Sequence, residues 1–242
     1  MLRIRTFRAI DDVDSCALFA AGHAKVLLDY GVTKVTSSST DWFYNPAVLV
    51  MMAENEETGE VVGGIRIHKA DGITKLPMED AISLVDERVF NLIDNYTPEG
   101  TAELCGLWNS KNTAGMGIGS YYLMRAGISA APAFGLTTLF ALCAPHTLNI
   151  SVEKGFEVEK SIGNKGTFIY PKLDLVATSI LIKDLAHIPH AKDSEKEIIF
   201  HLRKYPVCRR TETSSKGEME IAYNLLMNPS ASLRAEATLV SA

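Results

Sequence analysis

Residues 111–127 read KNTAGMGIGSYYLMRAG, and this stretch governs how the rest of the chain is interpreted. Glycines stand at positions 115, 117 and 119, and an amphipathic run follows at once. Glycine lets the backbone approach a partner closely, because no Cβ stands in the way. The first turn of a following helix offers free N–H groups and a positive dipole end, which favour an anion. The stretch therefore predicts either a loop that holds a phosphate group or a tight turn between a strand and a helix.

Two familiar nucleotide-binding loops fit this stretch poorly. A nucleoside triphosphatase loop ends in Gly-Lys-Ser/Thr, whereas Ser120 follows Gly119 with no lysine between them. A dinucleotide fingerprint places GxGxxG directly after a strand and an acid about 20 residues later. Here SKNTA separates the glycines from the preceding strand, and the next apolar run, LTTLFALCA at 136–144, ends without an acid.

Strand patterns recur along the rest of the chain. Period-two alternation and short apolar runs predict strands at 2–8, in a hairpin over 47–70, at 101–110, at 136–144, and once or twice over 166–185.

Helical patterns alternate with these strands. Spacing and stop signals predict helices over 79–95, from about 119 to 131 before Pro132, and over 147–155. Asp11 and Asp12 offer caps for one more helix. Its expected apolar positions are Val13, Ala17, Leu18, Ala21 and Leu28. The order of these strands and helices predicts a mixed α/β domain over 1–185. The remaining residues, 186–242, are predicted to form an extension that contains one helix, one strand and a loose tail.

Composition narrows the function classes. The formal net charge of −5 and the pI near 5.7 argue against a dedicated nucleic-acid binder, which needs a positive surplus. The four cysteines form no CxxC pair and are expected to be reduced thiols of a cytoplasmic protein. No apolar run approaches the ~20 residues of a membrane span, and the charged start does not resemble a secretory signal. His187, His190 and His201 lack the partners of a metal site, so no metal is expected.

Three segments together resemble the GCN5-related N-acetyltransferase (GNAT) superfamily. AGMGIGS, residues 114–120, is similar to the family's (Q/R)xxGx(G/A) loop, with Gly117 and Gly119 at the glycine positions and Ala114 where Gln or Arg is usual. AELCGLWNS resembles the fourth strand of the family, and VEKGFEV at 152–158 resembles the segment that follows the fifth strand. The resemblance covers about residues 45–175. It implies a mixed, mostly antiparallel central sheet with splayed fourth and fifth strands and flanking helices.

The resemblance also implies an activity and a co-substrate. It implies transfer of an acyl group, acetyl in the first instance, from acyl-CoA to the amine of a small molecule by direct nucleophilic attack. The backbone amides of 115–119 would hold the CoA pyrophosphate. The implied co-substrate-binding residues are Leu107, Asn109, Gly115, Met116, Gly117, Ile118, Gly119, Ser120 and Asn149.

Three residues are the catalytic candidates. Glu103 lies on the fourth strand, where many family members carry an acid, and would act as the base; a salt-bridged glutamate at a strand end is the plain alternative. The family's leaving-group acid is commonly a tyrosine, and that position falls near Ser151. Ser151, His146, Tyr121, Tyr122 or water would replace it, although His146 also suits a cap or a surface position.

A second resemblance concerns one branch of this superfamily. ELCGLW, residues 103–108, is similar to the ELSR-type strand of acyl-homoserine-lactone synthases and N-acyl amino acid synthases, with Gly106 at the arginine position. That branch draws long acyl chains from acyl carrier protein, which would then be a partner. A member that only binds acyl-CoA or a partner protein is the third alternative. A homodimer is left open.

Overall fold

The computed structural model describes residues 1–32, 39–113, 115–171, 175–214 and 216–227. Within them ten strands form one sheet in the order β6-β8-β5-β4-β3-β2-β1-β10-β9, with β7 paired to β8. The strands are β1 Leu2–Arg8, β2 Val48–Asn55, β3 Val61–Lys69, β4 Ala102–Asn109, β5 Leu139–Cys143, β6 Glu157–Val158, β7 Thr167–Ile169, β8 Val176–Ile182, β9 Val207–Ser214 and β10 Gly217–Asn224. The α-helices are α1 Val13–Asp29, α2 Pro77–Ile82, α3 Arg88–Tyr96, α4 Met124–Ala130, α5 Pro145–Glu153 and α6 Asp193–Lys204.

The sheet is mixed and mostly antiparallel, as predicted. Only the pairs β1–β10 and β4–β5 are parallel among the described strands. β4 and β5 meet at a single register pair, Glu103 with Phe140, and they diverge beyond it. The predicted fold class, including the splayed fourth and fifth strands, is confirmed.

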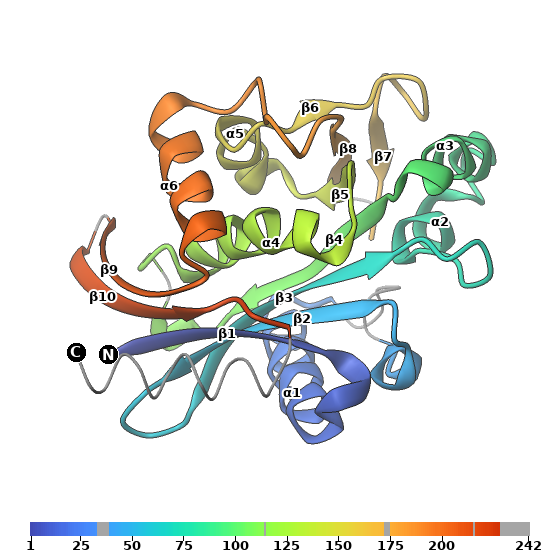
Figure 1. Ribbon diagram of the computed structural model, residues 1–242. Coiled ribbons are helices and arrows are strands. Elements are labelled where there is room, and N and C mark those ends of the chain that lie inside the picture. The colour runs from blue at the N-terminus through green and yellow to red at the C-terminus, as the bar shows by residue number, and fades with distance from the viewer. Residues whose placement is uncertain (33–38, 114, 172–174, 215, 228–242) are drawn as a thin grey trace.

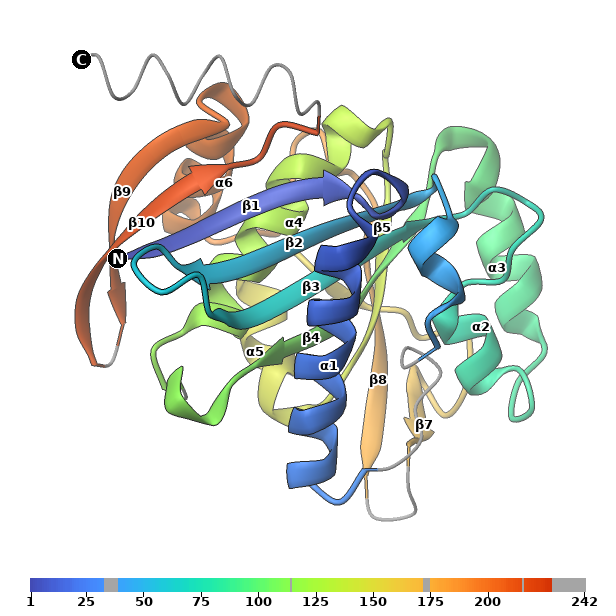
Figure 2. The ribbon, with the colours of Figure 1, turned by 90° about the horizontal axis from the view of Figure 1, so that it is seen from below.

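Helices cover both faces of the sheet. Figures 1 and 2 show α1 on one face, with α4 and α6 on the other. Because side chains alternate along a strand, β5 contributes to two separate cores. Leu139, Ala141 and Cys143 pack with the helix α4, whereas Phe140 and Leu142 pack with α2 and α3.

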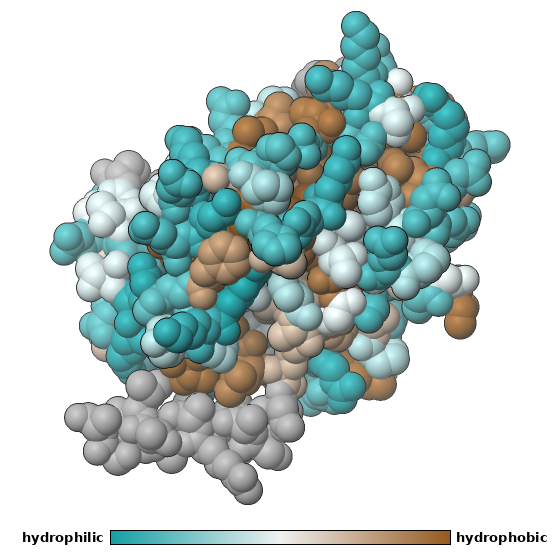
Figure 3. Space-filling view, turned by 45° about the horizontal axis from the view of Figure 1, so that its top comes forward, coloured by the Kyte–Doolittle hydropathy of each residue, from teal (hydrophilic) through white to brown (hydrophobic). Residues whose placement is uncertain are grey.

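The surface beyond these cores is polar over large areas. Figure 3 shows hydrophilic residues over most of the visible face, with apolar residues gathered in smaller places between them. No helix in the described ranges is both long enough and apolar enough to cross a membrane.

The apolar face predicted for α1 is wrong, although the predicted cap is confirmed. Asp12 caps the helix by accepting a hydrogen bond from the Ser15 amide at 3.0 Å. Leu18 and Leu28 are exposed, whereas the buried face carries Cys16, Phe19 and His23. The helix has apolar residues on more than one side, so periodicity alone did not identify the side that faces the sheet.

We expect Gly22→Ala to destabilise the protein, because α1 lies very close to the sheet at this residue. A Cβ on Gly22 would stand 2.1 Å from Cη2 of Trp108, which is an overlap. At an ordinary helix position the same change stabilises by about 1 kcal/mol, but overpacking costs about 1–3 kcal/mol. Urea unfolding measures the sign, with exposed Ala24→Ser on the same helix as the control. A more stable Gly22→Ala protein would contradict this packing.

The helix predicted over 79–95 is two helices. Asp86 interrupts the run, because its carboxylate accepts hydrogen bonds from the amides of Arg88 and Gly163, at 3.1 and 2.7 Å. The Arg88 side chain, which hydrogen-bonds that carboxylate, lowers the pKa of Asp86. The helix predicted from about 119 starts instead with a π-helix, Ile118–Leu123, which continues into α4.

The C-terminal residues add to the same sheet. The extension contains α6 and two strands, where one strand was predicted, and β10 pairs in parallel with β1. The predicted boundary at residue 185 stays a prediction, and the tail of that prediction falls largely outside the described residues.

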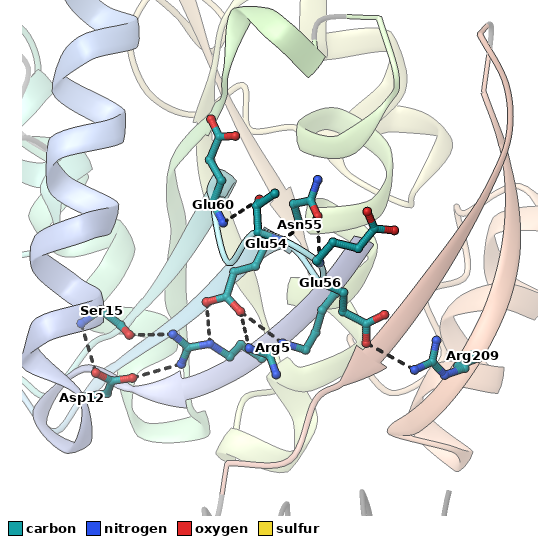
Figure 4. Close-up of polar contacts among 11 residues, drawn as sticks. Arg5, Asp12, Ser15, Glu54, Asn55, Glu56, Glu60 and Arg209 are labelled. Atoms are coloured by element: carbon teal, nitrogen blue, oxygen red, sulfur yellow. Dashed lines mark hydrogen bonds and ion pairs between the residues drawn. The ribbon is translucent and has the colours of Figure 1, made fainter. Parts of the chain in front are cut away.

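An ion-pair network anchors β1 to its neighbours (Figure 4). Arg5 Nε donates to Glu54 Oε1 of β2 at 2.8 Å, and Nη1 donates to Asp12 Oδ2 at the start of α1 at 3.0 Å. Arg209 of β9 donates to Glu56 beyond β2 at 3.3 Å. Arg5 therefore joins β1 to β2 and α1, and Arg209 joins β9 to the residues that follow β2.

Candidate active site

A cavity of about 710 Å³ lies where β4 and β5 diverge. One part of its wall belongs to the core under α4 and α5 and includes Leu104, Met124, Cys143, Phe156 and Ile180. The other part belongs to the α1 and α2 side and includes His23, Val26, Met78, Ala81 and Trp108. Because these two groups lie on opposite faces of the sheet, the cavity passes through the gap between the two strands. Two ligands can therefore approach one point from opposite faces.

A bulge in β4 lies at this gap. Gly106 has a φ of +62°, and the β3–β4 register shifts between the Gly64 and Arg66 pairs. Such a bulge with glycine in the left-handed region is typical of strands that re-aim a side chain beside a site. A Cβ on Gly106 would lie 3.0 Å from Arg66 Nε, so the fully buried guanidinium lies directly against the bulge. Arg66 also stacks over the Trp42 ring, 4.1 Å from its centroid.

Glu103 lies in the cavity wall and is 3% exposed. Its Oε2 accepts a hydrogen bond from the Met78 amide, in the first turn of α2, at 2.6 Å. Burial raises the pKa of Glu103 to about 8, although the Met78 amide and the positive charge of Arg66 oppose that rise. A carboxyl group with a pKa near neutrality can accept a proton from a substrate at physiological pH. The structure thus brings the predicted base into the cavity.

Two candidates for the leaving-group acid also line the cavity. Ser151 is fully buried on α5, and its hydroxyl donates to the Thr147 carbonyl at 2.9 Å. His146 is exposed at the start of α5, in the cavity wall. The two tyrosines are not among the described residues that line the cavity, because Tyr122 is buried elsewhere and Tyr121 faces Lys154.

The glycine loop adopts the backbone that its sequence predicts. Gly115 and Gly117 have φ values of +80° and +78°, a region that residues with a side chain rarely enter. A Cβ on Gly119 would stand 2.8 Å from Asn109 Oδ1, so a larger residue here would displace the Asn109 side chain. Among the described residues no acceptor is seen for the amides of Ile118, Gly119 and Ser120 at the start of the π-helix, so these amides can donate to an anion.

The other predicted co-substrate residues divide into two groups. Leu107, Asn109 and Ser120 line the cavity beside the loop. Ile118 is buried in the core and Met116 packs against it, so these two residues offer backbone groups only. The last predicted residue, Asn149, is exposed on α5 and is not among the described cavity residues. Ala114, at the position where the family usually has Gln or Arg, falls outside the described residues.

His23 is a cavity residue that the sequence did not single out. It follows Cys16 and Phe19 at helical spacing, and this stripe was the only signal in the sequence that could have found it. Within the described part of the chain, no group of three or more His, Cys, Asp or Glu residues could hold a metal ion.

Comparison with known proteins finds similarity in structure only. The sequence matches no family model and no curated protein. The fold is similar to that of FeeM, an N-acyl amino acid synthase from uncultured soil microbes, with a TM-score of 0.58 and 15% identity over 81% of this chain and 98% of FeeM. This chain has the GNAT acyltransferase fold.

Two acyl-homoserine lactone synthases share this fold. MesI, a CoA-dependent enzyme, has a TM-score of 0.52 and 11% identity over 84% of this chain and 95% of its own. BjaI, also CoA-dependent and solved with SAM and isopentyl-CoA, has a TM-score of 0.51 and 12% identity over 98% of this chain and 100% of its own. The resemblance inferred from the glycine loop is therefore confirmed for the fold.

Proposed function

We propose that this protein is an N-acyltransferase that moves an acyl group from acyl-CoA to a small-molecule amine by direct attack. The observation that carries the proposal is the cavity through the β4–β5 gap, with the protonatable Glu103 buried in its wall. Attack by an amine requires that the nitrogen be neutral and that a nearby group take its proton. Glu103 supplies that group at the centre of the fold.

The donor side of the cavity suits the phosphate and pantetheine parts of CoA. Gly115 and Gly117 give the loop its left-handed backbone, and the π-helix that follows presents amide donors to a pyrophosphate. Asn109 and Ser120 continue from this loop toward the cavity interior. A thioester carried along this path reaches the gap beside the Gly106 bulge.

The chemistry is assigned to three parts of the chain. Glu103, ionised, accepts a proton from the amine as the new C–N bond forms. Beyond Glu103, β4 no longer pairs with β5, so its backbone groups face the gap. This backbone, with the Arg66 charge behind it, stabilises the negative charge that develops on the thioester carbonyl oxygen. As the C–S bond breaks, the sulfur takes a proton from Ser151, His146 or water, so the products are an amide and free thiol.

The size of the cavity bears on the acyl group. A volume of about 710 Å³ lies within the ~300–1,000 Å³ of typical small-molecule sites. This volume has room for an acyl chain longer than acetyl, so hexanoyl-CoA is tested beside acetyl-CoA, and the sequence-based preference for acetyl stays a prediction. The similarity to FeeM favours, as the second candidate, an N-acyl amino acid synthase. The resemblance of ELCGLW to that branch adds acyl carrier protein as the donor of its acyl chain.

Binding and turnover measurements test the proposal. We expect CoA, acetyl-CoA and hexanoyl-CoA to raise the unfolding temperature, and hexanoyl-CoA with a primary amine to release free thiol. No stabilisation by any thioester or by CoA would contradict the CoA site. Binding without thiol release from any amine would favour a protein that only binds acyl-CoA. Turnover of acyl carrier protein thioesters alone would favour the second candidate.

A further inference from the structure

The α1 side of the cavity contains a histidine to which the proposed chemistry gives no role. His23 lines the cavity and is 6% exposed. Its ring lies 6.2 Å from the Phe19 ring, one turn earlier on the helix. At the adjacent Gly22, the Trp108 ring occupies the space where a Cβ would stand. The Phe19 ring therefore lies beside the imidazole, on a stretch of α1 that lies close to the sheet.

The imidazole of His23 is neutral. Burial, together with the positive charge of Arg66, lowers the pKa of His23 to about 4. A neutral imidazole carries one N–H donor and one nitrogen lone pair. His23 therefore offers a hydrogen-bond acceptor to the cavity without placing a positive charge there.

Apolar side chains line this side of the cavity. Val26 and Leu27 follow it on α1, and Met78 and Ala81 of α2 line the same half of the cavity. The Glu103 carboxyl group lines it as well. A ligand in this half thus meets mostly apolar side chains together with two buried acceptors, one from α1 and one from β4.

We propose that this half of the cavity receives a primary amine attached to an apolar body, and that His23 accepts a hydrogen bond from its nitrogen. This inference rests on the proposed function. A neutral amine has two N–H groups, of which one is directed to His23 and the other to Glu103. As the nitrogen attacks the carbonyl carbon, Glu103 takes its proton, the C–N bond forms and the C–S bond breaks. His23 neither gains nor loses a proton, and it orients the nitrogen lone pair.

Two substitutions of one residue test the hydrogen bond. With hexanoyl-CoA and phenethylamine, His23→Leu is expected to raise the KM for the amine about tenfold, the order expected for one hydrogen bond. His23→Gln, which keeps an acceptor, is expected to recover most of that loss, and neither change alters the KM for hexanoyl-CoA. His187→Leu, at an exposed histidine, is the matched control. An unchanged amine KM in His23→Leu, or a pH profile shifted by either change, would overturn the assigned role.

A matched pair of acceptors tests the substrate class. Phenethylamine and phenylalanine differ by one carboxylate, and burying an unpaired carboxylate is costly. We expect phenethylamine to have at least a tenfold higher kcat/KM, and a preference for phenylalanine would overturn the apolar class.

Calorimetric titration of phenethylamine separates this inference from the proposed function. If the wild-type protein releases no thiol, binding that His23→Leu weakens still supports the amine site. If the wild-type protein does not bind phenethylamine, or His23→Leu binds it equally well, the inference fails. If the wild-type protein turns over phenethylamine and His23→Leu is equally active, the proposed function stands and only the role assigned to His23 is rejected.

Discussion

Glu103→Gln is expected to lower kcat/KM for acyl transfer by about 10²–10⁴-fold, the usual contribution of a general base. Glutamine keeps the size of the side chain and can still accept the hydrogen bond from the Met78 amide. It cannot accept a proton from the amine. The measurement is thiol release from hexanoyl-CoA with phenethylamine. Activity within twofold of the wild type would remove Glu103 as the base.

The pH dependence gives this first prediction a second readout. Because the pKa of Glu103 is raised to about 8, its contribution to the wild-type rate should rise with pH up to about 8 and level off as the carboxylate forms. The ratio of variant to wild-type rates cancels the ionisation of the amine itself, and we expect this ratio to fall across the same range. The charged or titratable groups around Glu103 are Arg66 and His68 of β3, Cys105 of β4, and Glu79 and Asp80 of α2.

Glu103→Gln should lower activity but raise the stability of the folded protein relative to the wild type as the pH rises. A carboxyl group whose pKa is raised on folding stabilises the folded state fully below its unfolded value of 4.5, and this contribution is lost as the pH rises through about 8. Glutamine does not ionise. Glu103→Gln should therefore gain stability relative to the wild type between pH 5 and pH 8, which urea unfolding at both pH values measures independently of activity.

Arg125→Met is expected to cost about 3–5 kcal/mol of stability, because it leaves two buried carboxylates without their shared partner. Arg125 of α4 binds Glu195 of α6 through Nε and Nη2, at 2.7 and 2.6 Å, and Glu212 of β9 through Nη1 at 2.9 Å. All three side chains are nearly inaccessible. Tyr223 of β10 also donates to Glu212, at 3.1 Å. This cluster joins the C-terminal elements to the helix that follows the glycine loop.

A matched control separates the buried cluster from any loss of an arginine. Arg88→Met removes an ion pair with Asp86 whose arginine side chain is 63% exposed, and exposed pairs contribute about 0–1 kcal/mol. Urea unfolding of both variants and the wild type provides the comparison. Equal losses in the two variants would contradict a structural role for the cluster.

Sequence patterns identified the parts of the fold with strong local signals. The β2–β3 hairpin, β4 and the glycine loop follow from alternation and from glycines that adopt left-handed backbone angles. Glu103 could be predicted as the base because many members of the family that the sequence resembles carry an acid on the fourth strand. Its contact with α2 could not be foreseen, because it depends on Met78, 25 positions away in the sequence.

Other features depend on tertiary packing and left little trace in the sequence. His23 was missed because α1 carries apolar residues on several sides, and contacts with residues distant in sequence, such as Trp108, determine which side faces the sheet. The division of 79–95 into two helices results from Asp86 binding Gly163, which is distant in sequence. The polar strand β9 shows no alternation that would predict it, because its pairing with β10 holds it in the sheet.

A crystal structure with a non-hydrolysable thioether analogue of hexanoyl-CoA tests the central claim most directly. The account predicts that the pyrophosphate contacts the backbone amides of 117–119 and that the sulfur lies in the gap between β4 and β5, in the cavity shared with Glu103. An analogue bound elsewhere on the protein, or one whose sulfur stays outside that gap, would contradict acyl transfer at this site.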